Sequence, residues 1–466
     1  MHVPRRSFLA APLLSLAGWR AAKAQAAAFA GRWSGLLDAG AQQLRLRLEI
    51  DPDGSARLCS LDQGGEAIPA KASSAAPDQL TVKVPAVGGS FDGRRVSADR
   101  IEGVWRQGGE LPLVLTRGDV AAAPAPVQAL TPERLAELRR KAGSPALAAA
   151  AARGSGPARV WVDGERRTGS GAAVRETDIW HLGSITKSMT ATLIGRLVDA
   201  GKIAWDDTVG AGLAEIAPEM RPAYREVTFR HLLSHRSGLP ANIAMPSLLA
   251  YARENDDPRE ERRRYVRQAL SAEPVGAAGA AYTYSNSGYV AAAAILEARL
   301  GEPWEQLVRT HVFRPLGLAS AGFGAPGRAG ALDQPVGHAP SLLGGRTPHP
   351  PGQGITDNPA VLGPAGRAHM SLQDLLKYLA AHRDRGDFLK PATWKVLHTP
   401  AFGGDYAMGW MVRPEGVLWH NGSNTLWYAE AMVGREVVAA AAANDGHLPQ
   451  SGPAVGAALA AAAAAV

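Results

Sequence analysis

A proline- and alanine-rich stretch divides this 466-residue chain into two segments whose hydrophobic patterns predict different folds. The stretch, GDVAAAPAPVQALTPER at residues 118–134, is typical of a linker that leads into a helix capped at Thr131. Before it, runs such as LRLRLEIDPDGSARL alternate apolar and polar residues across Asp-Gly turns, which indicates β-hairpins. After it, strand-like and helix-like patterns are mixed. We therefore expect an all-β domain over residues 27–118, a linker over 119–130 and a larger α/β domain over 131–466.

The predicted all-β domain has several short strands with regularly spaced turn signals, which is typical of a small barrel or sandwich. It contains no recognisable combination of nucleophile, base and acid. We therefore expect an accessory domain that serves in binding or shapes the catalytic cleft. The chemistry should lie in the C-terminal segment.

Residues 1–26 resemble a twin-arginine export signal. Arg5 and Arg6 precede a modest apolar run, and the segment closes with small-x-small sequences of the kind that signal peptidases cleave. The apolar run is too short to span a bilayer, so stable membrane insertion is not expected. Cys59 is the only cysteine, which excludes an intrachain disulfide and suits a protein that folds before export. We expect an exported protein, periplasmic or secreted.

The net charge of +7 comes from arginines that are interleaved with acidic residues, as in PREERRRYVRQAL at 258–270. Such a run is typical of the solvated face of a helix. No basic stripe carries the stacking aromatic residues that nucleic-acid binding would need. Nucleic acid is therefore not an expected partner, and a small molecule or peptide is.

The run HLGSITKSMTATLIGRLVDAG at 181–201 predicts an amphipathic helix that places Ser184 and Lys187, at i and i+3, on one face of its first turn. An N-cap serine with a solvated lysine would explain the pair without any chemistry. The nucleophile elbow Gly-x-Ser-x-Gly is absent, and Ser184 is the only serine followed three residues later by lysine. A lysine in a dry pocket loses its charge and can accept a proton from a hydroxyl.

Two further groups lie downstream. YTYSNSGY supplies Tyr284 and Asn286, although Tyr-Ser-Asn alone is more typical of a turn. LWHNGSNTLW places His420 and Gly422 on a predicted strand, where the glycine would let a ligand backbone approach closely. A tyrosine near a lysine can be drawn toward the phenolate, because an opposite charge lowers its pKa.

His231 and His235 have the i, i+4 spacing of a helical metal site. No glutamate follows the first histidine and no third ligand is evident, so packing or capping within the helix is the favoured interpretation. A metallohydrolase is kept as a distant alternative, and no metal or cofactor is expected.

The order and spacing of Ser184-x-x-Lys187, Tyr284-x-Asn286 and His420-x-Gly422 resemble the three conserved boxes of the serine penicillin-recognising hydrolases. That superfamily contains class C β-lactamases, D,D-peptidases and related esterases. The resemblance covers residues 130–445 and includes VTFRHLLSHRSGLP and GPAGRAHMSLQDLLKYL. It implies an antiparallel sheet flanked by helices, together with an all-helical lobe.

The resemblance also implies roles for these residues. Ser184 would be the acylated nucleophile, Lys187 would orient it and move its proton, and Tyr284 would be the general base in acylation and activate water in deacylation. Asn286 would hydrogen-bond the acyl-side amide or carbonyl of the substrate. The backbone N–H groups of Ser184 and Ser423 would form the oxyanion hole.

The third box departs from the Lys-Thr-Gly usual in β-lactamases, because it reads His420-Asn421-Gly422. A histidine near its reference pKa of about 6.5 is mostly neutral at neutral pH, whereas lysine is charged. This change should weaken recognition of anionic β-lactams and affect neutral esters or amides less. Protonation of His420 should then strengthen the binding of substrates that carry a carboxylate.

We therefore expect an exported serine hydrolase that forms an acyl-enzyme on Ser184 and cleaves ester, amide or D-amino-acid peptide bonds. A true β-lactamase or D,D-carboxypeptidase is the first alternative. A catalytically inactive binding protein on the same fold is an alternative of another class. The oligomeric state stays open.

Overall fold

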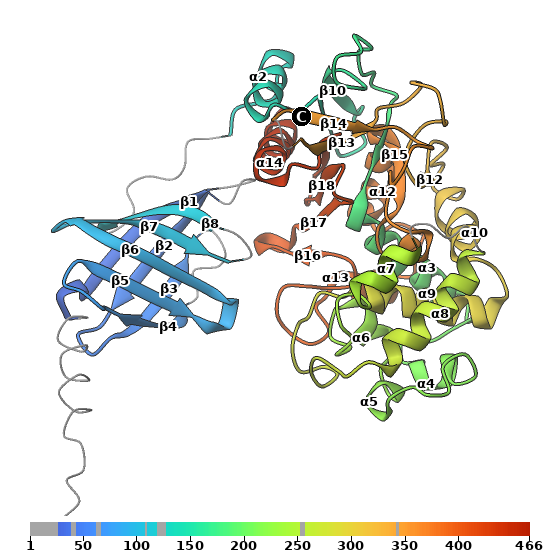
Figure 1. Cartoon of the computed structure of the whole chain (residues 1–466), viewed down its shortest axis with the longest axis horizontal. Helices are drawn as coiled ribbons and strands as arrows, with labels where there is room; N and C mark the ends of the chain where they lie inside the picture. The colour runs from blue at the N-terminus through green and yellow to red at the C-terminus, as the bar shows by residue number, and fades with distance from the viewer. Residues whose placement is uncertain are drawn as a thin grey trace, which may run out of the picture. The chain divides into compact units, whose positions relative to one another are not determined.

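The computed structural model describes residues 27–38, 43–61, 67–107, 110–118, 127–251, 257–341 and 344–466 (Figure 1). It divides the chain into two compact units, Met1–Pro126 and Val127–Val466, each with its own core. The predicted export signal lies outside the described residues. Within the described part of the chain, no helix combines the length and the apolar character needed to cross a membrane.

The N-terminal unit is a closed barrel of eight antiparallel strands, which confirms the predicted all-β fold. Alternate residues point inward, as Leu80, Val82 and Val84 do on one strand, and Trp33 and Trp105 help to fill the interior. The free thiol of Cys59 is buried. The strands are β1 (Gly31–Asp38), β2 (Gln43–Ile50), β3 (Ser55–Ser60), β4 (Ala67–Ser73), β5 (Gln79–Val84), β6 (Gly89–Ser97), β7 (Arg100–Arg106) and β8 (Glu110–Arg117).

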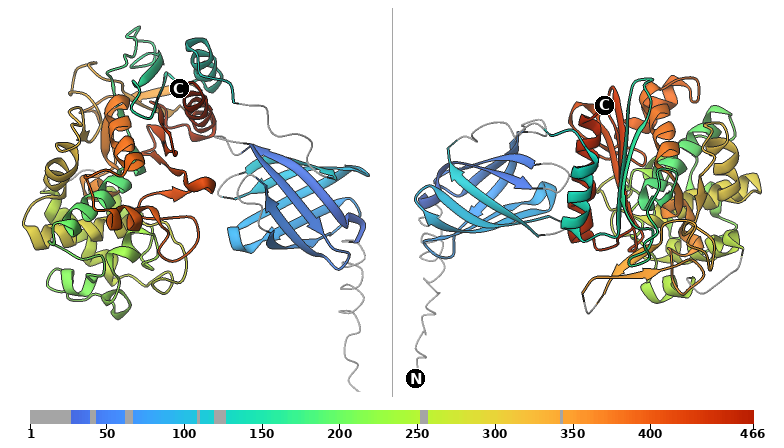
Figure 2. Two further views of the ribbon diagram at one scale, coloured as in Figure 1. Left: turned by 180° about the vertical axis from the view of Figure 1, so that it is seen from behind. Right: turned by 90° about the horizontal axis from the view of Figure 1, so that it is seen from above.

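The C-terminal unit is built on a six-stranded antiparallel sheet with the order β10-β9-β19-β18-β17-β16. Helices α2 and α14 cover one face and α12 covers the other (Figure 2). The sheet and these helices are β9 (Ala146–Arg153), β10 (Arg159–Gly164), β16 (Met411–Val412), β17 (Leu418–Ser423), β18 (Tyr428–Val433), β19 (Val437–Ala443), α2 (Pro132–Ala142), α12 (Leu372–Asp384) and α14 (Leu448–Ala464). This arrangement confirms the predicted sheet flanked by helices.

A helical lobe completes the predicted fold. It is formed by α4 (Val209–Leu213), α5 (Pro222–Arg225), α6 (Phe229–Leu233), α7 (Met245–Tyr251), α8 (Pro258–Ser271), α9 (Asn286–Leu300) and α10 (Trp304–Val308). Helix α3 (Thr186–Asp199) lies in the same hydrophobic core as this lobe and one face of the sheet. Three short strands, β11 (Ile179–His181), β12 (Gly322–Phe323) and β15 (Ala368–Ser371), form a small sheet beside the start of α3.

The arginine-rich segment 258–270 forms the predicted helix, α8, but Arg262 departs from the expected solvated face. The Arg262 side chain is completely buried, and it forms ion pairs with Glu297 on α9 and Glu305 on α10 at 2.6 and 2.8 Å. A guanidinium can leave water here because two carboxylates replace its hydration. The remaining arginines of α8 lie mostly on the surface.

Candidate active site

Ser184 lies at the junction between β11 and α3. Gly183 has a φ of +49°, in the left-handed region that glycine adopts without strain, and it turns the chain into a 3₁₀ turn over Gly183–Ile185. The apolar stripe predicted for this helix is buried, at Ile185, Met189, Leu193 and Leu197. Its burial fixes the first turn, so that Ser184 and Lys187 lie on the same side.

Lys187 is completely buried, so it is not the solvated lysine of the simpler interpretation. Its Nζ lies 3.0 Å from Ser184 Oγ, 2.7 Å from Asn286 Oδ1 and 2.8 Å from the carbonyl oxygen of Ala365. No carboxylate is among these three partners. Burial therefore lowers the pKa of Lys187 well below its ordinary value.

Tyr284 points its hydroxyl at the same serine. The phenol donates a 2.7 Å hydrogen bond to Ser184 Oγ, and the ring centroid lies 4.7 Å from Lys187 Nζ. Burial raises the pKa of Tyr284 to about 12, although its hydrogen bond to Ser184 opposes the shift. The expected shift toward phenolate is therefore wrong, because burial disfavours the charged phenolate more than the hydrogen bond to Ser184 favours it.

Asn286 is the first residue of α9, one position after Ser285, whose side chain caps that helix by accepting from Gly288 N. The Asn286 side chain uses Oδ1 to accept from Lys187 and Nδ2 to donate to Asn242 Oδ1 at 3.0 Å. Asn242 was missed by sequence reasoning. It lies in a loop with no motif that would have marked it.

Strand β17 carries the third box and packs against the turn that presents the serine. A Cβ on Gly422 would lie 2.4 Å from Ser184 N, and one on Gly183 would lie 2.3 Å from Ser423 N. The backbone N–H groups of Ser184 and Ser423 are therefore brought close together. Gly422 was predicted to let a ligand backbone approach closely, but the backbone that lies against it is the turn that carries Ser184.

His420 is 3% exposed, and its Nε2 lies 2.9 Å from the hydroxyl of Tyr406. Burial is the main cause that lowers the pKa of His420 to about 3, and Lys187 contributes less. The expectation that His420 titrates near its reference value is therefore wrong. Its imidazole stays neutral at any pH near neutrality.

The His231 and His235 pair serves packing and capping. His231 Nδ1 accepts from the backbone N–H of Thr228 at the start of α6. His235 Nδ1 accepts from Ser285 N at 2.9 Å, and its ring lies 4.3 Å from that of Tyr284. In the described parts of the chain, no group of three or more His, Cys, Asp or Glu side chains is arranged to hold a metal ion.

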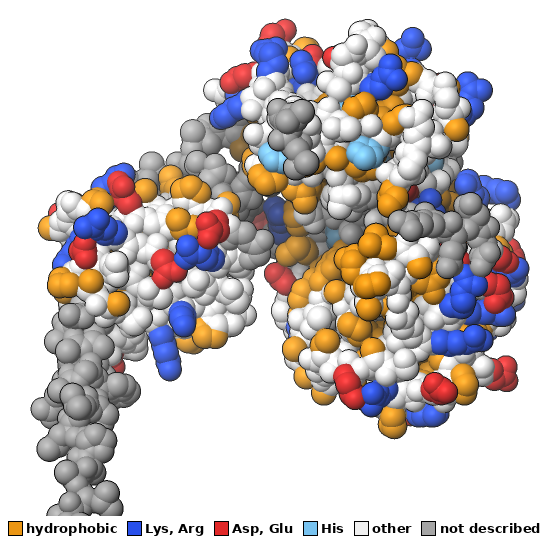
Figure 3. Space-filling model, in the orientation of Figure 1, with side chains coloured by type: hydrophobic (Ala, Val, Ile, Leu, Met, Phe, Trp, Pro, Cys, Tyr) orange, Lys and Arg blue, Asp and Glu red, His pale blue; other side chains and the backbone are white. Residues whose placement is uncertain are grey.

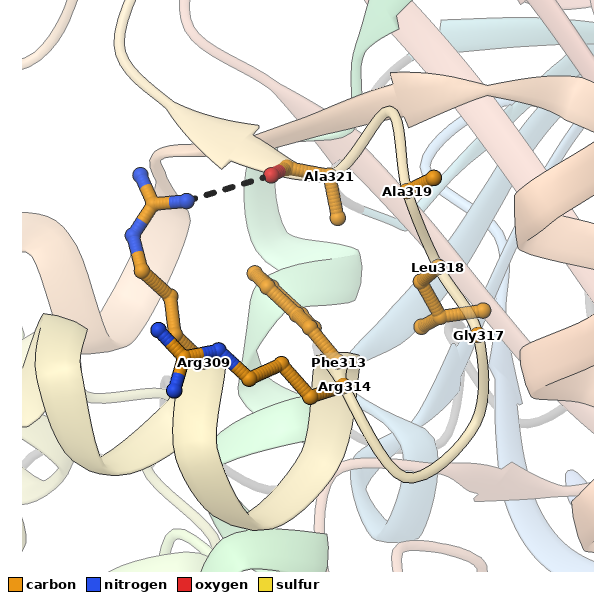
Figure 4. Close-up of a pocket in the computed structure, with 7 residues that line it drawn as sticks. All are labelled: Arg309, Phe313, Arg314, Gly317, Leu318, Ala319 and Ala321. Carbon is orange, nitrogen blue, oxygen red and sulfur yellow. Dashed lines mark hydrogen bonds between the residues drawn. The ribbon is translucent and has the colours of Figure 1, made fainter.

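A separate cavity of about 390 Å³ contains none of the residues of the three boxes (Figure 4). Two guanidinium groups border it, those of Arg309 and Arg314, and Arg309 donates to the carbonyl oxygen of Ala321.

On the molecular face shown in Figure 3, basic and acidic side chains are interspersed. That face shows no continuous basic surface.

Comparison with known proteins agrees with this geometry. Residues 132–464 match the family model described as Beta-lactamase. Penicillin-binding protein 4 of Amycolatopsis lactamdurans is 28% identical over 236 residues, which are 49% of this chain and 58% of that protein. Esterase EstB of Burkholderia gladioli is 31% identical over 33% of this chain and 41% of its own length. The chain thus spans less than two thirds of either relative.

Solved structures share the fold. EstCE1, described as a hydrolase with promiscuous acyltransferase activity, aligns with a TM-score of 0.58 at 18% identity, over 71% of this chain and 98% of its own. The D-amino acid amidase of Ochrobactrum anthropi aligns with a TM-score of 0.55 at 20% identity, over 71% and 97% of the two chains. With the family match covering most of its length, the chain belongs to the beta-lactamase family of hydrolases, as the three boxes predicted.

Proposed function

We propose that this protein is a serine hydrolase that forms an acyl-enzyme on Ser184. The observation that carries the proposal is the position of Ser184 Oγ, which lies 3.0 Å from Lys187 Nζ and 2.7 Å from the hydroxyl of Tyr284. A serine hydroxyl needs a base within hydrogen-bond reach to become a nucleophile, and it has one here.

We propose that Lys187 is the base in the resting enzyme, because its burial disfavours the charged ammonium. A neutral amine has two N–H groups, and the two carbonyl oxygens of Asn286 and Ala365 accept both. The lone pair is then directed at Ser184, whose hydroxyl proton it can receive. Tyr284, protonated at neutral pH, already donates to the same oxygen. This differs from the role of general base that the resemblance implied for Tyr284.

Acylation then follows in balanced steps. Ser184 Oγ attacks the acyl carbon while its proton passes to Lys187. Tyr284 gives its phenolic proton to the departing oxygen or nitrogen and regains one from the Lys187 ammonium. Water attacks the acyl-enzyme in the second half-reaction, and the same groups act in reverse. The N–H groups of Ser184 and Ser423 stabilise the oxyanion in both halves, and one such donor contributes about 3 to 4 kcal/mol to barrier lowering.

The environment of His420 favours neutral substrates. A buried imidazole with a pKa of about 3 supplies no positive charge at neutral pH to pair with a substrate carboxylate. Neutral esters and amides, including amides of D-amino acids, are therefore the substrate class that we propose. The comparison proteins described as an esterase and a D-amino acid amidase are consistent with it. Anionic β-lactams and peptides with a free carboxylate are the alternative substrates.

Intact-protein mass spectrometry with a fluorophosphonate probe tests the nucleophile. We expect one adduct on wild type and none on Ser184→Ala, which should also lose turnover of p-nitrophenyl esters. Equal labelling of the two proteins would refute the proposal. A panel of p-nitrophenyl esters, D-amino-acid amides, D-alanyl-D-alanine peptides and nitrocefin then ranks the substrate classes, and faster turnover of nitrocefin than of every neutral substrate would refute the substrate assignment.

We also propose, from the sequence of residues 1–26, that the protein is exported by the twin-arginine route. Replacing Arg5 and Arg6 together by lysine should retain the precursor in the cytoplasm, because the pathway reads this pair. Cell fractionation with an antibody against the mature chain measures the effect. Unchanged export would refute this route.

A further inference from the structure

A buried carboxylate outside the three boxes connects the two backbone segments that would form the oxyanion hole. Asp357 lies in the loop before the 3₁₀ turn Ala360–Leu362, which leads into α11 (Gly363–Gly366), and its side chain is 4% exposed. Its Oδ1 accepts from Asn424 Nδ2 at 2.8 Å and from Asn358 N at 2.7 Å, and its Oδ2 accepts from Arg367 Nε at 3.2 Å. Polar contacts this numerous around one buried group fix its position.

His181 links this carboxylate to the serine turn. Its Nε2 lies 2.9 Å from Asp357 Oδ1, in a bent contact whose N–H is not aimed straight at the oxygen. Its Nδ1 accepts from the backbone N–H of Gly183 at 3.1 Å. Because Nδ1 is an acceptor, the ring proton lies on Nε2, the nitrogen 2.9 Å from the carboxylate oxygen. The imidazole therefore joins Asp357 to the residue immediately before Ser184.

Asn424 links the same carboxylate to the other donor. It follows Ser423, the last residue of β17, and its Oδ1 accepts from Leu426 N while its Nδ2 donates to Asp357. Thr425, with a φ of +71°, turns the chain just beyond it. The Asp357 carboxylate thus contacts the residue after Ser423 directly and, through His181, the residue before Ser184.

The same loop reaches the third part of the site. Asn358, the neighbour of Asp357, donates from Nδ2 to the carbonyl oxygen of Gly366 at 2.9 Å. The preceding carbonyl oxygen, that of Ala365, accepts from Lys187 Nζ. Residues 357 and 358 therefore connect the serine turn, the end of β17 and the carbonyl that orients the proposed base.

We propose that Asp357 and His181 are positioning residues that hold the oxyanion hole in its reactive geometry. The inference rests on the proposed function, since it presupposes an acyl transfer at Ser184. Neither side chain bonds to Ser184 Oγ. Each acts through backbone: His181 through Gly183, and Asp357 through both His181 and Asn424.

Asp357→Asn is the first test, because it keeps the shape and replaces an acceptor oxygen by a donor nitrogen. We expect kcat for a p-nitrophenyl ester to fall about 10- to 100-fold, with KM within about 3-fold of wild type. This loss of kcat does not exceed the loss caused by removing one oxyanion donor. The inhibition constant of phenylboronic acid, which forms a tetrahedral adduct on a serine, should weaken by a comparable factor. A merely structural role would lower the amount of folded protein without this selective loss in kcat.

Glu297→Gln is the matched control. Glu297 is also a buried carboxylate paired with an arginine, but it lies about 16 Å along α9 from Asn286, at 1.5 Å per residue. We expect its kcat, per folded molecule measured by circular dichroism, to stay within about 3-fold of wild type. An equal loss of kcat in both variants would overturn the proposal.

His181 variants keep the test open if Asp357→Asn does not fold. His181→Asn can retain an acceptor for Gly183 N, and His181→Gln can retain a donor toward Asp357, so each preserves only one of the two links. Both should lower kcat about 10-fold with little change in KM. Wild-type kcat in Asp357→Asn, or in both His181 variants, would overturn the inference. Turnover that survives in Ser184→Ala would instead refute the proposed function.

Discussion

A single methyl group on Gly422 provides the sharpest test of the geometry around Ser184. The Cβ of an alanine there would lie 2.1 Å from Leu182 O, 2.4 Å from Ser184 N and 2.8 Å from Gly183 C. All three are backbone atoms, so no side chain can rotate away. Reaching an ordinary contact of 3.4 Å requires the turn and the strand to separate by about 1.3 Å.

That separation sets the expected loss. A displacement of about 1 Å at a reacting centre costs about 100-fold in rate, and loss of one oxyanion donor costs about 10² to 10³ in kcat, or about 3 to 4 kcal/mol. We therefore expect kcat of Gly422→Ala to fall by about 10² to 10³. Gly183→Ala is a poorer probe, because its φ of +49° adds backbone strain of its own.

Gly386→Ala is the matched control, since its Cβ would meet no atom within 4 Å. We expect its stability to change by less than about 0.5 kcal/mol and its kcat to match wild type. Steady-state ester hydrolysis and thermal unfolding measure both variants. A folded Gly422→Ala enzyme with kcat within about 3-fold of wild type would refute the placement of the two amides beside the reactive serine.

Three other predictions concern protons. Tyr284→Phe removes the donor to Ser184 Oγ and should lower kcat by about 10² to 10⁴ in the same ester assay, and a loss below about 10-fold would contradict its role. The increase of kcat/KM with pH should report the deprotonation of Lys187, with an apparent pKa well below the ordinary lysine value of about 10.4. A kcat/KM that still increases above about pH 10 would contradict a neutral lysine as the base. The free energy of unfolding, measured with urea, should decrease as the pH falls below about 6.5, by up to about 1.4 kcal/mol per pH unit for each buried histidine. Between the pKa of the unfolded state and the lower pKa of the folded state, only the unfolded state binds a proton. Burial lowers the pKa of His338 to about 4 and the pKa values of His398 and His420 to about 3. Constant stability from pH 7.5 to 4.5 would contradict buried neutral histidines.

Local patterns were sufficient to predict the elements of the first and third boxes. The helix from Ser184 was predictable because its apolar stripe has the helical period, and His420 and Gly422 lie on the predicted strand, β17. Tyr284 lies in a loop and Asn286 begins α9, so their meeting with Lys187 could be expected only from the resemblance. Periodicity alone would have left them in a turn.

Two adjacent inner strands of the sheet, β9 and β19, carried no usable signal. β9 reads ALAAAAAR and β19 reads VVAAAAA, and both are buried on both faces. Alternation of polarity is lost when helices cover both sides of a sheet, and alanine is depleted in strands by propensity. Their small side chains are explained by the helices packed on either face, which sequence-local reasoning does not reveal.

The missed functional residues share one property. Asn242, Tyr406 and Asp357 all lie in loops, and each contacts another residue of the site far away in sequence. The buried Arg262 misled for the same reason, since its two carboxylate partners come from other helices. Spacing along the chain cannot reveal such contacts, because the fold creates them.

The chemical groups of the site were predictable, whereas the extent to which burial shifts their pKa values was not. A lysine that a dry pocket makes neutral, a tyrosine drawn toward phenolate and a mostly neutral histidine were expected in one site. Burial disfavours the charged form of each, so it lowers the pKa of Lys187 and His420 and raises that of Tyr284. A neutral lysine can accept the serine proton, a neutral phenol can donate, and a neutral imidazole cannot attract a carboxylate. We therefore propose that burial both activates the nucleophile and biases the site toward uncharged acyl substrates.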